Sequence, residues 1–246
     1  MNAHANRELL RVDRLTKTFG GFTALSNVSI NVARGERFGL IGPNGSGKTT
    51  LINCVSGSLR NDSGTIEFDS EEISGLPAYQ RTRRGIARSF QIPRPFKSMS
   101  VIENLVVPLE FVVYRGSLHK SDTRAEAMQI LESMGLADKA DILSSQLSQV
   151  ELRKMELARA MAARPQLLIS DEAMAGLSGN EITEVLDILF KLNETGITVI
   201  MIEHIMQAVM RFSQRVICLD AGEIICEGTP QSIVQDERVQ RAYLGV

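Results

Sequence analysis

The sequence predicts an α/β fold in which helices cover the faces of a mostly parallel sheet, and three observations support this prediction. Short apolar runs alternate with segments of helical periodicity, which is the order that parallel strands joined by helices require. A glycine-rich stretch lies directly between one apolar run and one helical segment. The chain has 246 residues, of which 43% are hydrophobic, so it can bury a sizeable core. We expect one α/β domain built of two lobes.

Two kinds of pattern predict the strands. Residues 25–32 alternate apolar and polar side chains, which is typical of a half-exposed antiparallel strand that precedes the core. The runs RFGLIG, PQLLIS and VICL are short and mostly apolar, which indicates strands that are buried on both faces. The sheet should therefore combine an antiparallel part with a buried, parallel part.

The helical segments lie between these strands. Residues 123–134 and 149–163 show helical periodicity, whereas the Pro-rich stretch QIPRPFKSMS indicates an irregular junction. We therefore predict a core formed by residues 1–90 and 165–246, with a helical insertion at 91–164.

Composition and charge restrict the class of protein. The formal net charge of -2 argues against general affinity for nucleic acid. The cysteines, Cys54, Cys218 and Cys226, are odd in number and lack metal-type spacing, which indicates thiols in a reducing compartment. The N-terminal stretch MNAHANRELLRVDRL has no apolar core, and no run reaches the roughly 18 to 20 apolar residues of a spanning helix. We expect a cytoplasmic protein that reaches a membrane only through another chain.

The stretch GPNGSGKTT fits the phosphate-loop pattern G-x-x-x-x-G-K-[ST] and lies between RFGLIG and the helical TTLINCVSG. In such a loop the glycines let backbone N–H groups face phosphates, and the following helix N-terminus favours negative charge. A glycine-rich turn without a ligand is the alternative, which the complete motif and its context disfavour. Lys48 is expected to meet the β and γ phosphates, and Thr49 to ligate Mg²⁺. The residues expected to bind nucleotide are Gly42, Pro43, Asn44, Gly45, Ser46, Gly47, Lys48, Thr49 and Thr50.

An acidic pair, Asp171 and Glu172, follows the apolar run QLLIS. Adjacent side chains on an extended backbone point in different directions, so Asp171 can serve Mg²⁺ while Glu172 addresses a water near the γ phosphate. An acidic pair before a turn is often a solvated loop, but its place after an apolar run in a phosphate-loop protein favours catalysis.

His204 ends the strand-like run GITVIMIEH and is the third catalytic candidate. A lone histidine at a strand end is often structural, yet this one could reach the γ phosphate or order the attacking water. The predicted catalytic set is therefore Lys48, Glu172 and His204.

In this order the motifs resemble the nucleotide-binding subunit of ATP-binding-cassette (ABC) transporters, and the resemblance covers essentially the whole chain. It implies a RecA-like P-loop NTPase core with an antiparallel β subdomain and an inserted α-helical subdomain. It also implies that Phe19 in KTFGGFTAL stacks on adenine, and that Gln91 in RSFQIPRPF contacts nucleotide and Mg²⁺. Judged alone, Phe19 could equally be a core aromatic and Gln91 a solvated amide. AGLS at 175–178 resembles the loop that crosses the dimer interface.

Three further features resemble the ATPases of bacterial importers for branched-chain amino acids: the RxF step after Gln91, the stretch ELARAMAARPQLLISDEAMAGLS and the ending RAYLGV. Such an importer combines two ATPases, two membrane permeases and an extracytoplasmic solute-binding protein. The resemblance therefore implies a peripheral subunit at the cytoplasmic face of the inner membrane. Lipopolysaccharide-export ATPases and urea- or amide-import ATPases share much of this pattern and remain alternatives.

The stretch LSQVELRKMELARA occupies the place of the family's LSGGQ signature, which meets the γ phosphate of ATP held by the opposite subunit. Ser148 is kept and is expected to bind in trans, whereas Gln149, Val150 and Glu151 replace two glycines and a glutamine. The β-branched side chain of Val150 should block the close approach of the backbone, and it also disfavours positive φ. We expect an impaired signature half-site beside a complete phosphate-loop site on the same chain.

The charge of Glu151 and two smaller differences from the family's motifs also bear on whether the signature half-site is impaired. Glu151 adds negative charge near a triphosphate, which we expect Arg153 and Lys154 to offset in part. Ala173 and Ser178 stand where the family usually has proline and an aspartate or asparagine. The expected partner is a second ATP-binding subunit, in a homodimer or a heterodimer. A degenerate regulatory subunit remains an alternative to a transport ATPase.

Two segments are candidates for surfaces that bind other molecules. The arginines of RTRRGIARSF could bind nucleic acid, but the near-neutral chain favours a solvated helix face that ends at Gly85 and is followed by a strand toward Gln91. An ABC-type ATPase acting on DNA or ribosomes is further disfavoured because this chain has neither a second cassette nor a long coiled-coil insertion. We expect residues 91–114 to contact a permease, since the family places that surface beside the glutamine.

Overall fold

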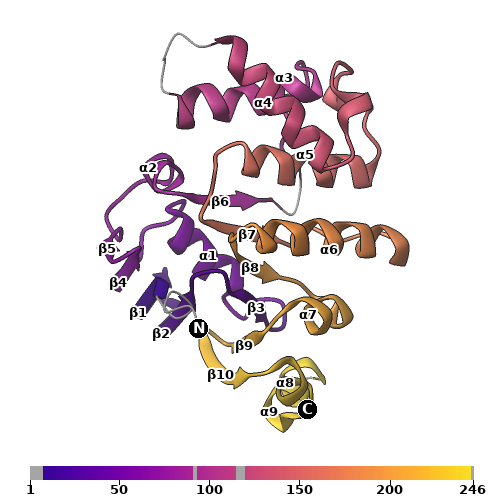
Figure 1. The fold of residues 1–246 in the computed structure, drawn as a ribbon. Coiled ribbons are helices and arrows are strands. Elements are labelled where there is room, and N and C mark those ends of the chain that lie inside the picture. Colours follow the sequence, from indigo (N-terminus) through magenta and orange to yellow (C-terminus); the bar gives the residue numbers. More distant parts are fainter. Residues whose placement is uncertain (1–7, 91–92, 115–119, 245–246) are drawn as a thin grey trace, which may run out of the picture.

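The computed structural model describes residues 8–90, 93–114 and 120–244. Within these residues a six-stranded sheet of order β10-β9-β3-β8-β7-β6 forms the centre (Figure 1). Neighbours from β9 to β6 pair in parallel, and β10 pairs antiparallel with β9. Every residue of β7 and β8 is buried, as expected of parallel strands covered on both faces. The strands are β3 (Arg37–Ile41), β6 (Ile86–Ser89), β7 (Leu167–Asp171), β8 (Thr198–Ile202), β9 (Arg215–Asp220) and β10 (Glu223–Gly228).

A second sheet is antiparallel, with order β2-β1-β4-β5 in the described part of the chain. Its long strands β1 and β2 form a hairpin around Gly20 and Gly21, whose positive φ angles of 51° and 93° suit a tight turn. Buried and exposed residues alternate over much of β2, which confirms the antiparallel strand predicted at 25–32. The strands are β1 (Glu8–Phe19), β2 (Phe22–Ala33), β4 (Ser63–Phe68) and β5 (Glu71–Glu72).

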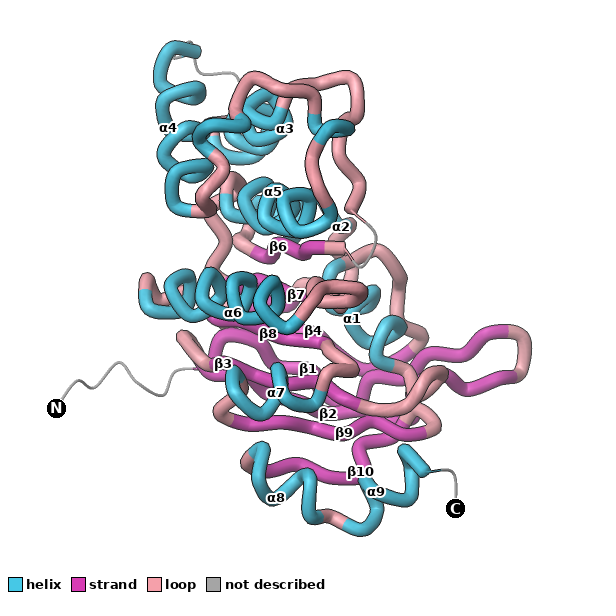
Figure 2. Tube along the Cα trace, turned by 90° about the vertical axis from the view of Figure 1, so that its right-hand side faces the viewer, coloured by secondary structure: helices cyan, strands magenta, loops and turns pink. Residues whose placement is uncertain are grey.

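A helical group lies between β6 and β7 in the sequence. It occupies one end of the molecule, while α8 and α9 lie at the other end with the sheets between them (Figure 2). The predicted helices at 123–134 and 149–163 are confirmed, with ends that differ by a few residues. The group comprises α3 (Val101–Pro108), a π-helix η1 (Leu109–Val113), α4 (Lys120–Ser133), the short 3₁₀ turns η2 (Ala137–Lys139) and η3 (Ser144–Gln146), and α5 (Gln149–Met161).

The other helices connect the strands. α1 begins directly after the glycine-rich loop that follows β3, and α6 and α7 follow β7 and β8. None of the described helices is both long and apolar enough to cross a membrane. These helices are α1 (Lys48–Ser56), α2 (Ala78–Arg83), α6 (Gly179–Glu194), α7 (Met206–Phe212), α8 (Pro230–Gln235) and α9 (Glu237–Leu244).

Buried apolar side chains join these layers. One cluster connects α1 with both sheets and includes Leu51, Phe38 and Ile66. Another connects the helical group with α6 and β8. Burial of such side chains contributes about 1.5 to 3 kcal/mol each. The predicted fold class, a P-loop NTPase core with an antiparallel β subdomain and an inserted helical subdomain, is confirmed.

The predicted solvated helix face in RTRRGIARSF is wrong for Arg81, whereas the strand predicted after Gly85 is confirmed as β6. Arg81 is only 1% exposed, and its guanidinium donates to the carbonyl oxygens of Cys54 at 2.6 Å and Val55 at 2.9 Å. It thereby binds carbonyls in the last turn of α1, where the helix leaves acceptors open, although the Cys54 carbonyl also accepts from the Gly57 N–H at 3.3 Å. Arg88 lies in β6 and forms an ion pair in the interior. The six residues of α2 were too few to reveal this burial by periodicity.

Candidate functional site

The loop at 42–47 joins the end of β3 to the start of α1. Gly42, Gly45 and Gly47 have φ angles of 147°, 81° and 106°, a region that residues with a Cβ rarely adopt. A Cβ at Gly42 would lie 2.1 Å from the Leu219 carbonyl oxygen, and one at Gly47 would lie 2.7 Å from the Ala24 carbonyl oxygen. All three glycines are therefore needed for the turn, and Gly42 and Gly47 also for close contact with neighbouring strands.

Lys48 opens α1, and its side chain folds back over the loop. Its Nζ donates to the carbonyl oxygens of Gly42 at 2.6 Å and Pro43 at 2.9 Å. Burial lowers the pKa of Lys48, while the nearby carboxylates of Glu172 and Asp171 act in the opposite direction. A cation is thus held in the loop where phosphate oxygens would approach.

A pocket of about 270 Å³ lies over this loop. It brings together Phe19 from the β1–β2 hairpin, the loop residues from Asn44 to Thr50, and two predicted catalytic residues, Glu172 and His204. Phe22 also lines the pocket, although sequence reasoning missed it. It is 63% exposed, so an exposed aromatic beside the Gly-Gly turn was the signal that could have identified it.

The prediction that both residues of the acidic pair lie on an extended backbone is wrong for Glu172. Asp171 is the last residue of β7, but Glu172 has a φ of 47°, in the left-handed region. The Asp171 Oδ2 lies 2.5 Å from Nη2 of Arg88, and both side chains are about one tenth exposed. Arg88 also donates to Oδ1 of Asn53 on α1 at 2.6 Å. Sequence reasoning missed this arginine, which links the acidic pair to the helix after the loop.

Glu172 and His204 meet beyond the ends of β7 and β8. His204 Nε2 lies 2.7 Å from Glu172 Oε1, while the Glu172 N–H donates to the Ile202 carbonyl oxygen at 2.9 Å. Parallel strands β7 and β8 are neighbours, so their carboxyl ends place these residues at one edge of the sheet. This edge is the one that carries the glycine-rich loop.

Glu203 is a buried carboxylic acid beside this pair that sequence reasoning also missed. It is 1% exposed, and its Oε1 accepts a hydrogen bond from the Met174 N–H at 2.9 Å. Burial raises the pKa of Glu203 to about 7, and the charge of Glu172 acts in the same direction. An acidic residue between an apolar strand and a histidine was the available signal.

The predicted signature segment begins α5 with a capping box. Ser148 Oγ accepts from the Glu151 N–H at 3.4 Å, and a Glu151 carboxylate oxygen accepts from the Ser148 N–H at 2.8 Å. These bonds to Ser148 lower the pKa of Glu151. The acidic residue thus stabilises the helix start and also keeps its charge close to Ser148.

The expected partial offset of Glu151 is confirmed for Lys154, whose charge helps to lower the pKa of Glu151 although it also pairs with Glu184. Arg153 is instead buried and donates to the Phe90 carbonyl oxygen at 3.3 Å. Lys139 also offsets the charge of Glu151, because its Nζ lies 3.9 Å from the Glu151 Oε1.

Three other positions singled out in the sequence lie in different surroundings or outside the described residues. Gln91 lies outside the described residues. Ser178, at the family's aspartate or asparagine position, caps α6 by accepting from the Glu181 N–H. Ala173 is buried. The described residues contain no group of three or more acidic, cysteine or histidine side chains placed to hold a metal ion, and Cys54, Cys218 and Cys226 are free thiols.

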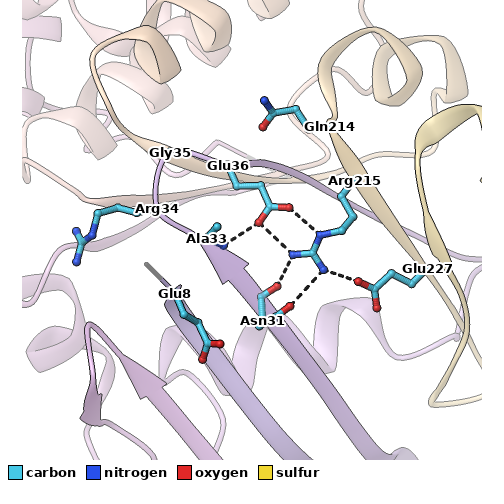
Figure 3. A pocket seen from close by; sticks show the side chains of 9 residues that line it. All are labelled: Glu8, Asn31, Ala33, Arg34, Gly35, Glu36, Gln214, Arg215 and Glu227. Atoms are coloured by element: carbon cyan, nitrogen blue, oxygen red, sulfur yellow. Dashed lines mark hydrogen bonds and ion pairs between the residues drawn. The ribbon is translucent and has the colours of Figure 1, made fainter. Parts of the chain in front are cut away.

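A larger hollow of about 670 Å³ lies at the opposite edge of the central sheet, before β3 and β9 begin (Figure 3). Arg215 crosses it and binds Glu36, Glu227 and Asn31 (Figure 3). Several polar groups of this hollow are therefore bound to one another. Moreover, ligands of open parallel sheets bind beyond the carboxyl ends of the strands, whereas this hollow lies at the opposite edge. The pocket over the glycine-rich loop is therefore the candidate active site.

Comparison with known proteins agrees with this assignment. Residues 25–175 match the ABC transporter family, and residues 223–246 match a family described as branched-chain amino acid ATP-binding cassette transporter. The chain is 37% identical over 252 residues to the high-affinity branched-chain amino acid transport ATP-binding protein LivG of Salmonella typhimurium, covering 98% of this chain and 99% of LivG. It is 35% identical to the lipopolysaccharide export system ATP-binding protein LptB of Haemophilus influenzae, covering 96% and 97%.

Solved structures extend the comparison. The ADP conformation of MJ1267, an ATP-binding cassette of an ABC transporter, has a TM-score of 0.88 and 32% identity, covering 98% of this chain and 100% of that one. The dimeric post-hydrolysis state of the cassette MJ0796, bound to ADP and Pi, has a TM-score of 0.82 and 28% identity, covering 90% and 99%. From its sequence, its fold and its phosphate loop, this chain belongs to the ABC transporter family as an ATP-binding subunit that hydrolyses ATP.

Proposed function

We propose that this chain binds MgATP over residues 42–50 and hydrolyses it to drive the import of branched-chain or other hydrophobic amino acids. One observation carries the hydrolytic part: a single pocket gathers the phosphate loop, an exposed aromatic and the Glu172–His204 pair. The amino-acid part rests on the likeness of residues 223–246 and of the whole chain to branched-chain amino acid transport ATPases.

The residues divide the chemistry among them. Phe19 offers a face for adenine, and the loop N–H groups with the N-terminus of α1 bind the phosphates. Lys48 exchanges the carbonyls of Gly42 and Pro43 for phosphate oxygens. Glu172 orients the attacking water and accepts its proton, and His204 holds Glu172 in place through the 2.7 Å contact.

The donors near the loop fit Mg²⁺, which prefers oxygen ligands. Thr49 presents an exposed hydroxyl at the start of α1, and Asp171 presents a carboxylate at the end of β7. Arg88 binds Oδ2 of Asp171, so we assign Oδ1 to the ion or to its bound water. When bound, Mg²⁺ supplies charge neutralisation for the phosphates. Gln91 is proposed as a further contact of nucleotide and ion.

We infer that the active form is a dimer in which Ser148 serves the partner's ATP. The dimeric cassette MJ0796 supports this arrangement. Val150 occupies the second position of α5, where a glycine would let the backbone approach a phosphate. A heterodimer with a second ATPase that carries an intact signature would hydrolyse ATP mainly at this chain's phosphate loop.

A permease is proposed to dock on the groove between the core and the helical unit at 91–164. The groove measures about 400 Å³ and is lined by parts of α1, α2, β6, α3, η1 and α5. Phe96 and Phe111 are 45% and 67% exposed at its margin, among the basic side chains of Arg94 and Arg159. Exposed aromatics with arginine are typical of protein interfaces. Docking here would hold the chain at the cytoplasmic face of the membrane.

Transport measured in proteoliposomes tests the proposal. The chain would be reconstituted with candidate permeases, a candidate second ATPase and a candidate solute-binding protein of the same organism. ATP-dependent uptake of labelled leucine, abolished by Lys48→Ala, supports the proposal. Uptake of urea or an amide instead, or lipopolysaccharide release without uptake, would assign the chain to one of the alternative systems. ATP binding without hydrolysis in single-turnover assays would make it a regulatory subunit.

A further inference from the structure

The C-terminal helices return to the phosphate loop. Ile233 of α8 and Val239 of α9 pack in one apolar cluster with Ile41, the last residue of β3, and with Cys218 of β9. This packing places the side chain of Tyr243, near the end of α9, beside the first glycine of the loop. Tyr243 Oη accepts a hydrogen bond from the Gly42 N–H at 2.9 Å, across 201 positions of sequence.

The peptide groups around Gly42 are held from two sides. The Gly42 N–H donates to the Tyr243 phenol, and the Gly42 carbonyl oxygen accepts from Lys48 Nζ at 2.6 Å. A Cβ on Gly42 would lie 2.1 Å from the Leu219 carbonyl oxygen and 2.6 Å from Ser46 Oγ. The backbone therefore has little space on its third side, and small shifts at Gly42 would move the loop that follows.

We propose that Tyr243 is a positioning residue of the nucleotide site, which holds the start of the phosphate loop in its binding conformation. The inference rests on the nucleotide site proposed above and extends that site to α9. Tyr243 contacts Gly42 and is not among the residues that line the pocket over the loop, so it acts on affinity through the loop.

The consequence for binding follows from the two partners of Gly42. When Lys48 turns to phosphate oxygens, the Gly42 carbonyl gives up its ammonium partner, while the phenol keeps the N–H fixed. Partial burial raises the pKa of Tyr243, so the phenol stays neutral at physiological pH. A preordered loop lowers the entropic cost of binding, whereas bound nucleotide orders the loop in any case. The contact should therefore affect affinity for nucleotide more than turnover at saturation.

Tyr243→Phe in the full chain removes the acceptor and keeps the ring. Tyr79→Phe is the matched control, because the Tyr79 hydroxyl contacts only the neighbouring Gln80 side chain among the described hydrogen bonds. Calorimetric titration with MgADP should show a Kd higher by up to about fivefold for Tyr243→Phe, because one hydrogen bond that orders the free loop is worth about 1 kcal/mol. KM for ATP should rise by a similar factor and kcat should change by less than about twofold. Tyr79→Phe should match the wild type in all three.

Amide hydrogen exchange gives a readout that does not need the variant to fold. In the wild-type chain the Gly42 amide should exchange slowly, and slow exchange supports the contact. Exchange at Gly42 as fast as at an exposed backbone amide would overturn it. If the wild-type chain binds MgADP and Tyr243→Phe binds it with the same Kd, this inference alone is overturned. Wild-type chain that binds no MgADP would overturn the proposed function and this inference with it.

Discussion

His204 Nε2 lies 2.7 Å from Glu172 Oε1, and this contact joins the ends of two neighbouring parallel strands beside the phosphate loop. Glu172 leaves β7 with a left-handed backbone, so its carboxylate turns away from the direction that an extended strand would give. The side chain is 16% exposed and that of His204 is 37% exposed, so water can reach the pair. A carboxylate held by a histidine at this place suits the activation of a water molecule.

Glu172→Gln should therefore keep ATP binding and remove hydrolysis. Glutamine keeps the size and can still contact His204, but it cannot accept a proton from water. We expect kcat to fall by about 100-fold or more, with the Kd for MgATP within about threefold of wild type. Phosphate release and calorimetric titration measure the two quantities. Glu194→Gln, an exposed substitution on α6, is the control. Lost binding in Glu172→Gln would show that Glu172 is structural.

Arg88→Ala should destabilise the protein most in the absence of nucleotide. It leaves the largely buried Asp171 carboxylate without its ion pair and Asn53 without its donor. We expect a loss of about 2 kcal/mol in the free energy of unfolding, less than for a fully buried pair. MgADP should raise the melting temperature of Arg88→Ala more than that of wild type, because the ion supplies positive charge near Asp171.

Arg88→Lys is the matched variant, since it keeps the charge and loses the two-pronged geometry. Its melting temperature should lie between those of wild type and Arg88→Ala. If Arg88→Ala melts like wild type without nucleotide, the Arg88–Asp171 ion pair does not stabilise the fold.

Val150→Gly should increase hydrolysis in a homodimer of this chain, in which both sites borrow the altered signature. Val150 lies two residues after Ser148 in the first turn of α5 and packs partly against the apolar core of the helical group. We propose that its side chain also limits the approach of the partner's phosphate to the start of α5. Restoring close backbone contact should raise kcat about tenfold. Val150→Ala removes the branch and keeps a Cβ, so it should give a smaller increase. Steady-state ATPase assays compare them. An isolated wild-type chain with cooperative hydrolysis at transporter rates, unchanged by Val150→Gly, would disprove an impaired half-site.

The sequence revealed those parts of the site whose residues are contiguous or end a clear strand. The phosphate loop lies within residues 42–50, and Asp171, Glu172 and His204 follow apolar runs. The missed contacts join residues far apart in sequence: Arg88 and Asp171 are 83 positions apart, and Gly42 and Tyr243 are 201 apart. Such pairs depend on strand order and helix packing, which periodicity does not encode. The backbone turn at Glu172 was missed for the same reason.

Glu203 should make the stability of the protein depend on pH. Its burial raises its pKa from 4.5 to about 7, so the folded state favours the protonated acid. The stabilisation is therefore complete below pH 4.5 and is lost as the pH rises through about 7. The shift corresponds to at most about 3 kcal/mol. Glu203→Gln keeps an acceptor for the Met174 N–H and cannot ionise, so it should lack this dependence.

Chemical unfolding from pH 5 to pH 8 measures the effect as a difference between proteins. Other titrating groups largely cancel when the free energy of unfolding of Glu203→Gln is subtracted from that of wild type. The difference should fall steadily as the pH rises, because wild type must place a charge beside Glu172 in a buried site. Glu194→Gln, at an exposed position, should show a constant difference from wild type. A constant difference for Glu203→Gln as well would mean that Glu203 is ionised in the folded protein throughout this range, with its charge balanced by nearby groups such as Arg153.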